Sequence, residues 1–186
     1  CALASAVLTL TSAPAFAADV DLKVGDPAPK FEQKDENGKV WKSSDYIGKK
    51  IVVVYFYPAD LTGGCTKQAC GFRDDMKTLI DKDVVVVGVS GDSPENHQIF
   101  KKEHDLNFTL LADEAGSVGK AFGVRVGPGG VAKVKAGGKD IELKRGVTEK
   151  RWTFVIDKGG KVAVKNTEVK AAEDSKAIIK AVEGLK

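Results

Sequence analysis

The sequence lacks a cluster of basic residues, and this bears on its partners. Its net charge is only +3, and the lysines are spread along the chain. Because nucleic-acid binding requires basic residues gathered on one face, we do not expect a nucleic-acid partner. Histidine is also scarce: the chain has His97 and His104, which lie on a predicted surface helix with no cysteine near them in sequence. We therefore expect no metal site.

A long apolar run is missing as well. The most apolar stretch is residues 1–17, CALASAVLTLTSAPAFA, which is short and interrupted by Ser, Thr and Pro. It does not predict a membrane span, so we expect no stable membrane association. The stretch carries no charge and ends in Ala-Phe-Ala, the pattern of a secretory signal, and we expect cleavage after Ala17. Lipidation of Cys1 is an alternative, disfavoured because the apolar run after it is a poor spacer.

That signal predicts an exported protein, in the periplasm, a compartment like the thylakoid lumen, or the medium. The remaining residues, 18–186, are expected to form the functional domain. The chain is 42% hydrophobic and 30% charged, which is ordinary for a globular protein, and no internal repeat or interdomain linker is evident. We predict one domain with a sizeable core.

Apolar periodicity predicts an α/β domain. Residues 51–57 and 83–90 have the pattern of strands buried on both faces. A helical pattern follows each of them, the first starting at Cys65 and the second capped by Ser93 and running to about Asp105. This alternation predicts a parallel sheet core. Around it we expect an N-terminal hairpin with strands near Phe31 and Val40, a short strand at 108–111, a short helix at 114–122, a hairpin of residues 152–157 and 161–164, and a closing helix at 171–185. The Gly- and Lys-rich residues 123–150 form an insert, expected to be an exposed β-hairpin or a long loop.

Cys65 and Cys70 would remain after cleavage, and a cysteine pair in an exported protein can form a disulfide. On one helix, their spacing places the Cα atoms about 8.6 Å apart. That exceeds the limit of roughly 7 Å for a bridge without backbone movement. A bond between them thus requires the first helical turn to unwind, which favours a switching disulfide. Helical spacing puts Cys65 on the apolar stripe and Cys70 nearer the polar side.

Cys65 follows a Pro/Gly turn, PADLTGG, at the start of the predicted helix. The free N–H groups and dipole of a helix N-terminus favour a thiolate, and Gly63 and Gly64 leave the approach uncrowded. Thr62 adds a hydroxyl. A cation is also needed, and the best candidate is Arg151, because it starts the predicted strand WTFVID and its planar fork can hold a thiolate and a second polar atom.

These residues closely resemble a known family, the peroxiredoxins. Pro58, Thr62 and Cys65 form Pro-x3-Thr-x2-Cys, and Arg151 precedes TFVID. Cys70 within ACGFRD is similar to the Q-type, or bacterioferritin comigratory protein, branch of the alkyl hydroperoxide reductase/thiol-specific antioxidant family. The resemblance covers about residues 24–164. It implies a thioredoxin-like fold, with a central mixed sheet flanked by helices and an N-terminal β-hairpin.

The resemblance also implies a thiol-dependent peroxidase of the atypical 2-Cys type, acting on hydrogen peroxide and organic hydroperoxides. Cys65 would be the peroxidatic cysteine that becomes a sulfenic acid, and Cys70 the resolving cysteine that forms an intramolecular disulfide with it. Thr62 and Arg151 would orient the peroxide, and Pro58 would shield the nucleophile from water. A thioredoxin-like dithiol would reduce the disulfide. No metal or organic cofactor is required, and a monomer or weak dimer is expected because the resolving cysteine is intramolecular.

Three positions depart from the family pattern, and one of them is Trp152, which follows the arginine and is bulkier than usual. Gly63 stands where Pro is common, which predicts a looser first turn, and Gln68 stands where Glu is common, which predicts a weaker polar contact beneath the site. Two other functions stay open from the residues. One is a thiol-disulfide oxidoreductase of the same fold, although such proteins usually carry Cys-x2-Cys and this chain has Cys-x4-Cys. The other is a non-catalytic exported binding module held by one structural disulfide.

Overall fold

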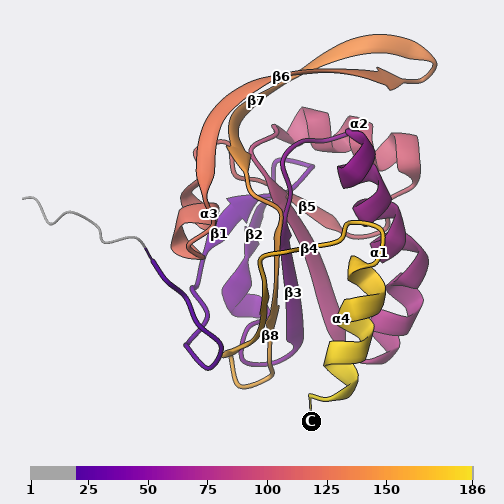
Figure 1. The fold of residues 1–186 in the computed structure, drawn as a ribbon. Coiled ribbons are helices and arrows are strands. Elements are labelled where there is room, and N and C mark those ends of the chain that lie inside the picture. Colours follow the sequence, from indigo (N-terminus) through magenta and orange to yellow (C-terminus); the bar gives the residue numbers. More distant parts are fainter. Residues whose placement is uncertain (1–19, 186) are drawn as a thin grey trace, which may run out of the picture.

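A five-stranded sheet runs through the middle of the molecule, in the strand order β5-β4-β3-β8-β9 (Figure 1). The computed structural model describes residues 20–185, so the predicted signal, residues 1–17, lies outside the described residues. The strands are β3 (Ile51–Phe56), β4 (Val84–Ser90), β5 (Thr109–Ala112), β8 (Trp152–Ile156) and β9 (Val162–Asn166). β3, β4 and β5 are parallel, whereas β8 is antiparallel to both of its neighbours. The predicted mixed sheet is confirmed.

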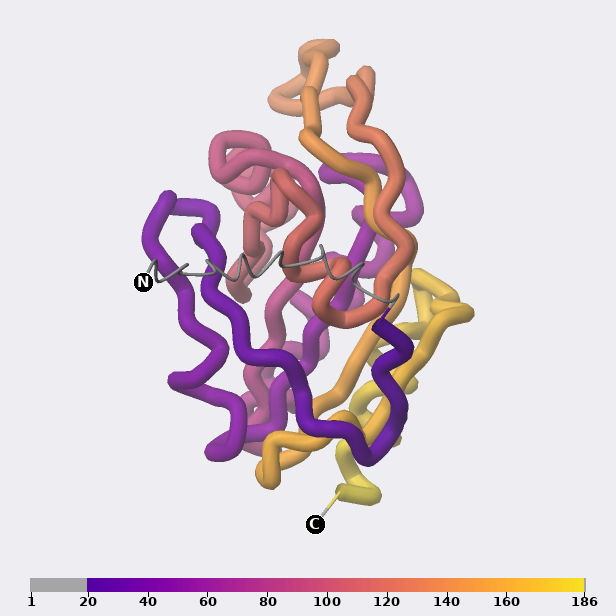
Figure 2. Tube along the Cα trace, turned by 90° about the vertical axis from the view of Figure 1, so that its left-hand side faces the viewer, coloured from indigo at the N-terminus to yellow at the C-terminus, as the bar shows by residue number. Residues whose placement is uncertain are grey.

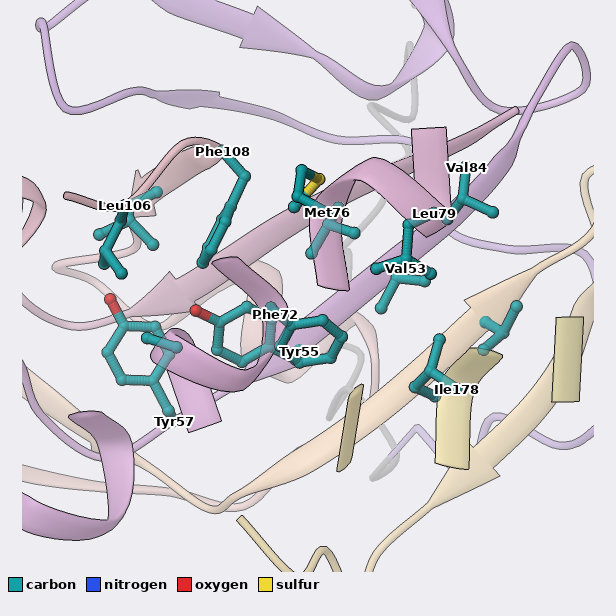
Figure 3. Packing of buried hydrophobic residues seen from close by; sticks show 14 of the residues in the cluster. Val53, Tyr55, Tyr57, Phe72, Met76, Leu79, Val84, Leu106, Phe108 and Ile178 are labelled. Carbon is teal, nitrogen blue, oxygen red and sulfur yellow. The ribbon is translucent and has the colours of Figure 1, made fainter. Parts of the chain in front are cut away.

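The alternation of side chains along β3 divides the interior into two cores. Every residue of this strand is buried, as its unbroken β-branched and aromatic run predicts. Ile51, Val53 and Tyr55 belong to one core, and Val52, Val54 and Phe56 to the other. Figure 3 shows the first core, where the Tyr55 ring lies stacked on Phe72 at 4.9 Å between centroids. Because both faces of the sheet are covered, the ends of its strands are the places left for a site.

Helices and a hairpin cover the two faces (Figure 1). α1 (Gly63–Asp81), α2 (Pro94–His104) and α4 (Asp174–Glu183) cover one face and contribute Phe72, Phe100 and Ile178 to its core. The other face is covered by α3 (Ser117–Ala121) and by the antiparallel pair β1 (Glu32–Lys34) and β2 (Val40–Lys42), which a 3-10 turn, η1 (Ser43–Asp45), follows. The predicted N-terminal hairpin is thereby confirmed. No helix within residues 20–185 is long and apolar enough to cross a membrane.

The Gly- and Lys-rich insert forms a long β-hairpin that projects from the body and arches over α2 (Figures 1 and 2). Its strands, β6 (Val126–Ala136) and β7 (Lys139–Glu149), pair from Val126↔Glu149 to Ala136↔Lys139. Of the two predicted alternatives, the hairpin is correct and the long loop is wrong. The strands are longer than the short alternating pieces suggested, because backbone pairing continues through the glycines. At the tip, the Gly137 amide donates to Glu103 Oε2 on α2 at 2.8 Å.

Two details of the sequence prediction are wrong. α1 begins at Gly63 rather than at Cys65, because both glycines adopt helical geometry and Thr62 takes the N-cap position. His97 was expected on a surface helix, but its side chain is fully buried. The face of α2 that packs on the sheet carries Asn96, His97 and Phe100, and a polar side chain tolerates that position when it finds a buried partner.

Candidate active site

Cys65 is the third residue of α1, just beyond the end of β3, and its side chain is 1% exposed. The first helical bond runs from the Thr66 amide to the Thr62 carbonyl at 2.8 Å. The amides before Thr66 therefore precede the regular helical bonds and point toward the helix N-terminus. This arrangement places the sulfur in the positive field at the start of the helix, which favours an anion.

Arg151 lies beside that sulfur, although 86 positions separate the two residues in the sequence. Its Nη2 donates to Cys65 Sγ at 3.1 Å. The register explains the encounter: β8 runs antiparallel to β3 and Trp152 pairs with Phe56, so the residue before Trp152 lies at the end of β3 that leads into the turn. The structure thus brings together the predicted nucleophile, Cys65, and the cation that the sequence analysis paired with it.

Gln68 continues this contact away from the sulfur. Its side chain is fully buried, its Oε1 accepts a hydrogen bond from Arg151 Nη1, and its Nε2 donates to Asp174 Oδ2 at 2.7 Å. Thr153 Oγ1 donates to the same Asp174 oxygen at 2.8 Å. Burial raises the pKa of Asp174, while hydrogen bonds from Gln68 and Thr153 and the charge of Arg151 act in the opposite direction. A polar contact beneath the site is therefore present, and the side-chain amide of Gln68 links Arg151 to Asp174 within it.

The two glycines before Cys65 differ in their surroundings. A Cβ atom at Gly64 would lie 3.3 Å from Arg151 Nη2, whereas one at Gly63 would meet nothing within 4 Å. Gly64 therefore leaves room for the guanidinium to approach Cys65. Gly63 lies exposed in open space as the first residue of α1, so the prediction of a looser first turn stays untested.

Thr62 and Pro58 lie in the turn that joins β3 to α1, and both are half-buried. Thr62 Oγ1 donates to the Ala59 carbonyl at 3.0 Å, so its hydroxyl stabilises the turn in this structure. Leu61, between them, has a φ of 58°, a left-handed conformation that is uncommon for a residue with a side chain. The roles of Thr62 in orienting peroxide and of Pro58 in shielding Cys65 stay predictions.

A buried polar network holds this turn from the α2 side. Asp60 is fully buried, and its Oδ2 lies 2.8 Å from His97 Nδ1 while its Oδ1 accepts from the Tyr57 hydroxyl at 2.7 Å. The Asp60 amide donates to Asp92 Oδ2 at 3.0 Å. Burial by itself would lower the pKa of His97, but the Asp60 carboxylate raises it and the net direction is upward. This pairing fixes the turn that carries Pro58 and Thr62.

Tyr55 lies under the site with its hydroxyl buried and without a hydrogen-bond partner among the described residues. Burial raises the pKa of Tyr55 well above its ordinary value, and the nearby Asp60 and Cys65 add to the effect. The phenol is therefore neutral, and its ring stacks on Phe72 and Tyr57 as an apolar floor (Figure 3).

Cys70 lies on the same helix as Cys65, and both are free thiols. As the helical spacing predicted, Cys65 is buried and Cys70 is partly exposed. Both residues lie within one continuous helix, so an ideal separation of about 8.6 Å between their Cα atoms applies.

Sequence reasoning missed the contribution of Asp174, Asp60 and His97. Gln68 was identified from the sequence as a polar contact beneath the site, and its position three residues after Cys65 places both residues on one face of the helix. Asp174 offered no such signal, since it reaches the site only through the packing of α4 on α1.

Comparison with known proteins gives consistent matches. The model of the AhpC/TSA family matches residues 24–165. Peroxiredoxin Bcp of Bacillus subtilis (strain 168) is 40% identical over 153 residues, which cover 82% of this chain and 89% of that protein. A chloroplastic peroxiredoxin Q of Sedum lineare is 39% identical over 163 residues, covering 87% of this chain and 78% of that protein. The crystal structure of peroxidoxin BcpB from Mycobacterium tuberculosis superposes with a TM-score of 0.73 at 31% identity, over 89% of this chain and 99% of that one. The predicted thioredoxin-like fold is confirmed by this superposition.

Proposed function

The chain belongs to the AhpC/TSA family, as a peroxiredoxin of the Bcp/PrxQ branch, and from that membership we propose that it reduces hydroperoxides through a cycle of Cys65 and Cys70. The observation that carries the proposal is the contact of Arg151 Nη2 with Cys65 Sγ at 3.1 Å. A fixed guanidinium stabilises a thiolate, which is the reactive form of cysteine. Hydrogen peroxide and organic hydroperoxides are the proposed substrates.

In the first step, the Cys65 thiolate attacks one oxygen of the peroxide and the O–O bond breaks. The sulfur becomes a sulfenic acid, and the departing hydroxide or alkoxide takes a proton to leave as water or alcohol. Arg151 stabilises negative charge on the sulfur and on the peroxide oxygens, while the Thr62 hydroxyl turns from the Ala59 carbonyl to orient the substrate. Pro58 limits the access of water to the sulfur.

In the second step, the Cys70 thiolate attacks the sulfur of the sulfenic acid. A disulfide forms between Cys65 and Cys70 and hydroxide leaves, to be protonated to water. The start of α1 must unwind for the two sulfurs to meet. An external dithiol of the thioredoxin type then reduces the disulfide by thiol exchange, first at the partly exposed Cys70. This intramolecular cycle is that of an atypical 2-Cys enzyme, and it requires no dimer.

Two substitutions test the cycle. Cys65→Ser should abolish peroxide consumption, because a hydroxyl does not replace the thiolate as nucleophile. Cys70→Ser should still complete a first turnover, detected as a sulfenic acid trapped on Cys65, but should not cycle with thioredoxin. Peroxide consumption by Cys65→Ser at the wild-type rate would reject the peroxidase proposal. Undiminished multiple turnover by Cys70→Ser would reject only its role as resolving cysteine.

Export is a further part of the proposal. The uncharged, small-residue pattern of residues 1–17 supports it, with cleavage after Ala17 leaving a domain of residues 18–186 in the periplasm, a lumen-like compartment or the medium. Mass spectrometry of the exported protein should find Ala18 at the N-terminus. A mature chain that still contains residues 3–16 would contradict the proposal.

A further inference from the structure

Asp174 is a buried carboxylate that the proposed cycle does not use. It is the first residue of α4, its side chain is 2% exposed, and its Oδ1 has no hydrogen-bond partner among the described residues. A buried polar atom left unsatisfied is costly. Structural pairing explains only Oδ2, which accepts hydrogen bonds from both Gln68 and Thr153. A carboxylate kept in such a place calls for a role beyond packing.

The contacts of Gln68 connect that carboxylate to the reacting sulfur. The carboxylate accepts from Gln68 Nε2 at 2.7 Å, the same amide accepts from Arg151 through Oε1, and Arg151 donates through Nη2 to Cys65 Sγ at 3.1 Å. Donors and acceptors alternate along the whole chain of contacts. The carboxylate therefore holds the amide with its oxygen toward Arg151, which has donors only.

We propose that Asp174 is a positioning residue for the peroxide reaction: through Gln68, its carboxylate fixes the Arg151 guanidinium against the Cys65 sulfur. Arg151 uses separate nitrogens of its fork for Gln68 and for Cys65. Because the guanidinium is planar and rigid, a hydrogen bond that holds one of its nitrogens also fixes the direction in which the other nitrogen points. Burial of both Gln68 and Asp174 keeps water from replacing either contact.

The inference rests on the proposed peroxidase function, so its test includes a reaction that needs no peroxide. Alkylation of Cys65 by iodoacetamide at neutral pH reports the reactivity of the thiolate directly. It is measured in a background that carries both Cys1→Ser and Cys70→Ser, so that Cys65 is the one thiol left to react. The rate of sulfenic acid formation with hydrogen peroxide is measured beside it. If the parent protein consumes no peroxide, the proposed function fails, while alkylation still tests the positioning by Asp174.

Asp174→Ala should slow both reactions by about tenfold, the change that loss of one hydrogen bond of typical strength produces. Asp174→Asn keeps an acceptor for Gln68, so it should slow the two reactions clearly less than Asp174→Ala does. In a Gln68→Ala background, Asp174→Ala should produce no further loss, because the route to Arg151 is already cut.

Asp75 provides a matched control at the same helix interface. It lies on α1 and its Oδ2 accepts from Ser175 Oγ on α4 at 2.8 Å, without reaching Arg151. Asp75→Ala should lower the melting temperature yet leave both rates within about twofold of the parent protein, a change too small for a lost hydrogen bond. An equal loss of rate in Asp75→Ala and Asp174→Ala would overturn the proposal, since general loosening of α4 would then explain both.

A rescue pair keeps the test decisive where Asp174→Ala does not fold. Glu is common at this position in the family, but in this chain Gln68→Glu would face the Asp174 carboxylate. Repulsion between the two carboxylates should disturb Arg151 and slow both reactions. Adding Asp174→Asn restores the alternation of hydrogen-bond donors and acceptors, because the new side-chain amide at position 174 can donate to the carboxylate at position 68 while that carboxylate accepts from Arg151. The rates of both reactions should then recover. Absence of recovery, or rates for Asp174→Ala equal to those of the parent protein, would overturn the positioning role.

Discussion

Oxidation of Cys65 and Cys70 should unwind the start of α1. The two residues lie on one helix that runs from Gly63 to Asp81. An intact helix holds their Cα atoms about 8.6 Å apart, and a disulfide needs them within roughly 7 Å. The residues between them must therefore leave helical geometry when the bond forms. Gln68 lies in that segment, so its contacts with Arg151 and Asp174 should break in the same event.

The size of the change follows from the helical bonds lost. Each backbone bond contributes about 0.5–1.5 kcal/mol net, so releasing the amides of residues 66–70 costs on the order of 3–7 kcal/mol. In the reduced protein, a free energy of opening of this size slows the hydrogen exchange of those amides by roughly 10²–10⁵-fold, because every 1.4 kcal/mol is a factor of ten. In the disulfide form most of this protection should vanish. The later turns should keep theirs, since Phe72, Met76 and Leu79 anchor them in the core.

Hydrogen exchange measured by mass spectrometry or NMR on the reduced and oxidised proteins tests this. A peptide covering residues 66–71 should exchange at least about 100-fold faster after oxidation, whereas peptides from residues 75–81 and from β3 should be unchanged. Cys70→Ser treated with peroxide is the control, because it forms the sulfenic acid without the disulfide. Equal protection of residues 66–71 in the two redox states would refute the reasoning.

Two further predictions concern charged groups. Arg151→Met should slow sulfenic acid formation in stopped-flow measurements by about 10–150-fold, because a hydrogen bond to a charged group contributes about 1.5–3 kcal/mol; a rate within threefold of wild type would show that the contact with Cys65 does not assist the reaction. Glu149 is 1% exposed, and burial, followed by the nearby Asp113, raises its pKa well above the ordinary value. The folded state thus binds the Glu149 proton more tightly than the unfolded state does. The resulting contribution to the free energy of unfolding is fully present below the ordinary pKa of a glutamate, and it is lost as the pH rises from that value through the raised pKa. Glu149→Gln should remove this fall and raise the melting temperature at neutral pH by at least about 2–4 °C, while an unchanged pH profile of thermal unfolding would contradict it.

Much of the fold could be predicted because its signals are local. The buried run of β3, the Ser93 cap of α2 and the hairpin of β8 and β9 depend on residues within a few positions of one another. The Ser93 side chain does accept from the Asn96 amide, as the cap predicted. His97 was misplaced because its partner, Asp60, is 37 positions away. A histidine on a helix face shows nothing in the sequence that distinguishes burial with a carboxylate from exposure.

The candidate site likewise has features that local sequence signals predicted and features that only tertiary packing decided. The turn and helix that present Cys65, the partial exposure of Cys70 and the value of a distant arginine followed from residue types and helical spacing, because a helix N-terminus and a 3.6-residue repeat act over short range. Only the tertiary structure decided that Arg151 meets the sulfur, through the antiparallel register of β8 on β3, and that Gln68 and Asp174 hold it from behind. Those contacts depend on how α4 packs against α1, and packing between elements distant in sequence leaves no periodic trace in the chain itself.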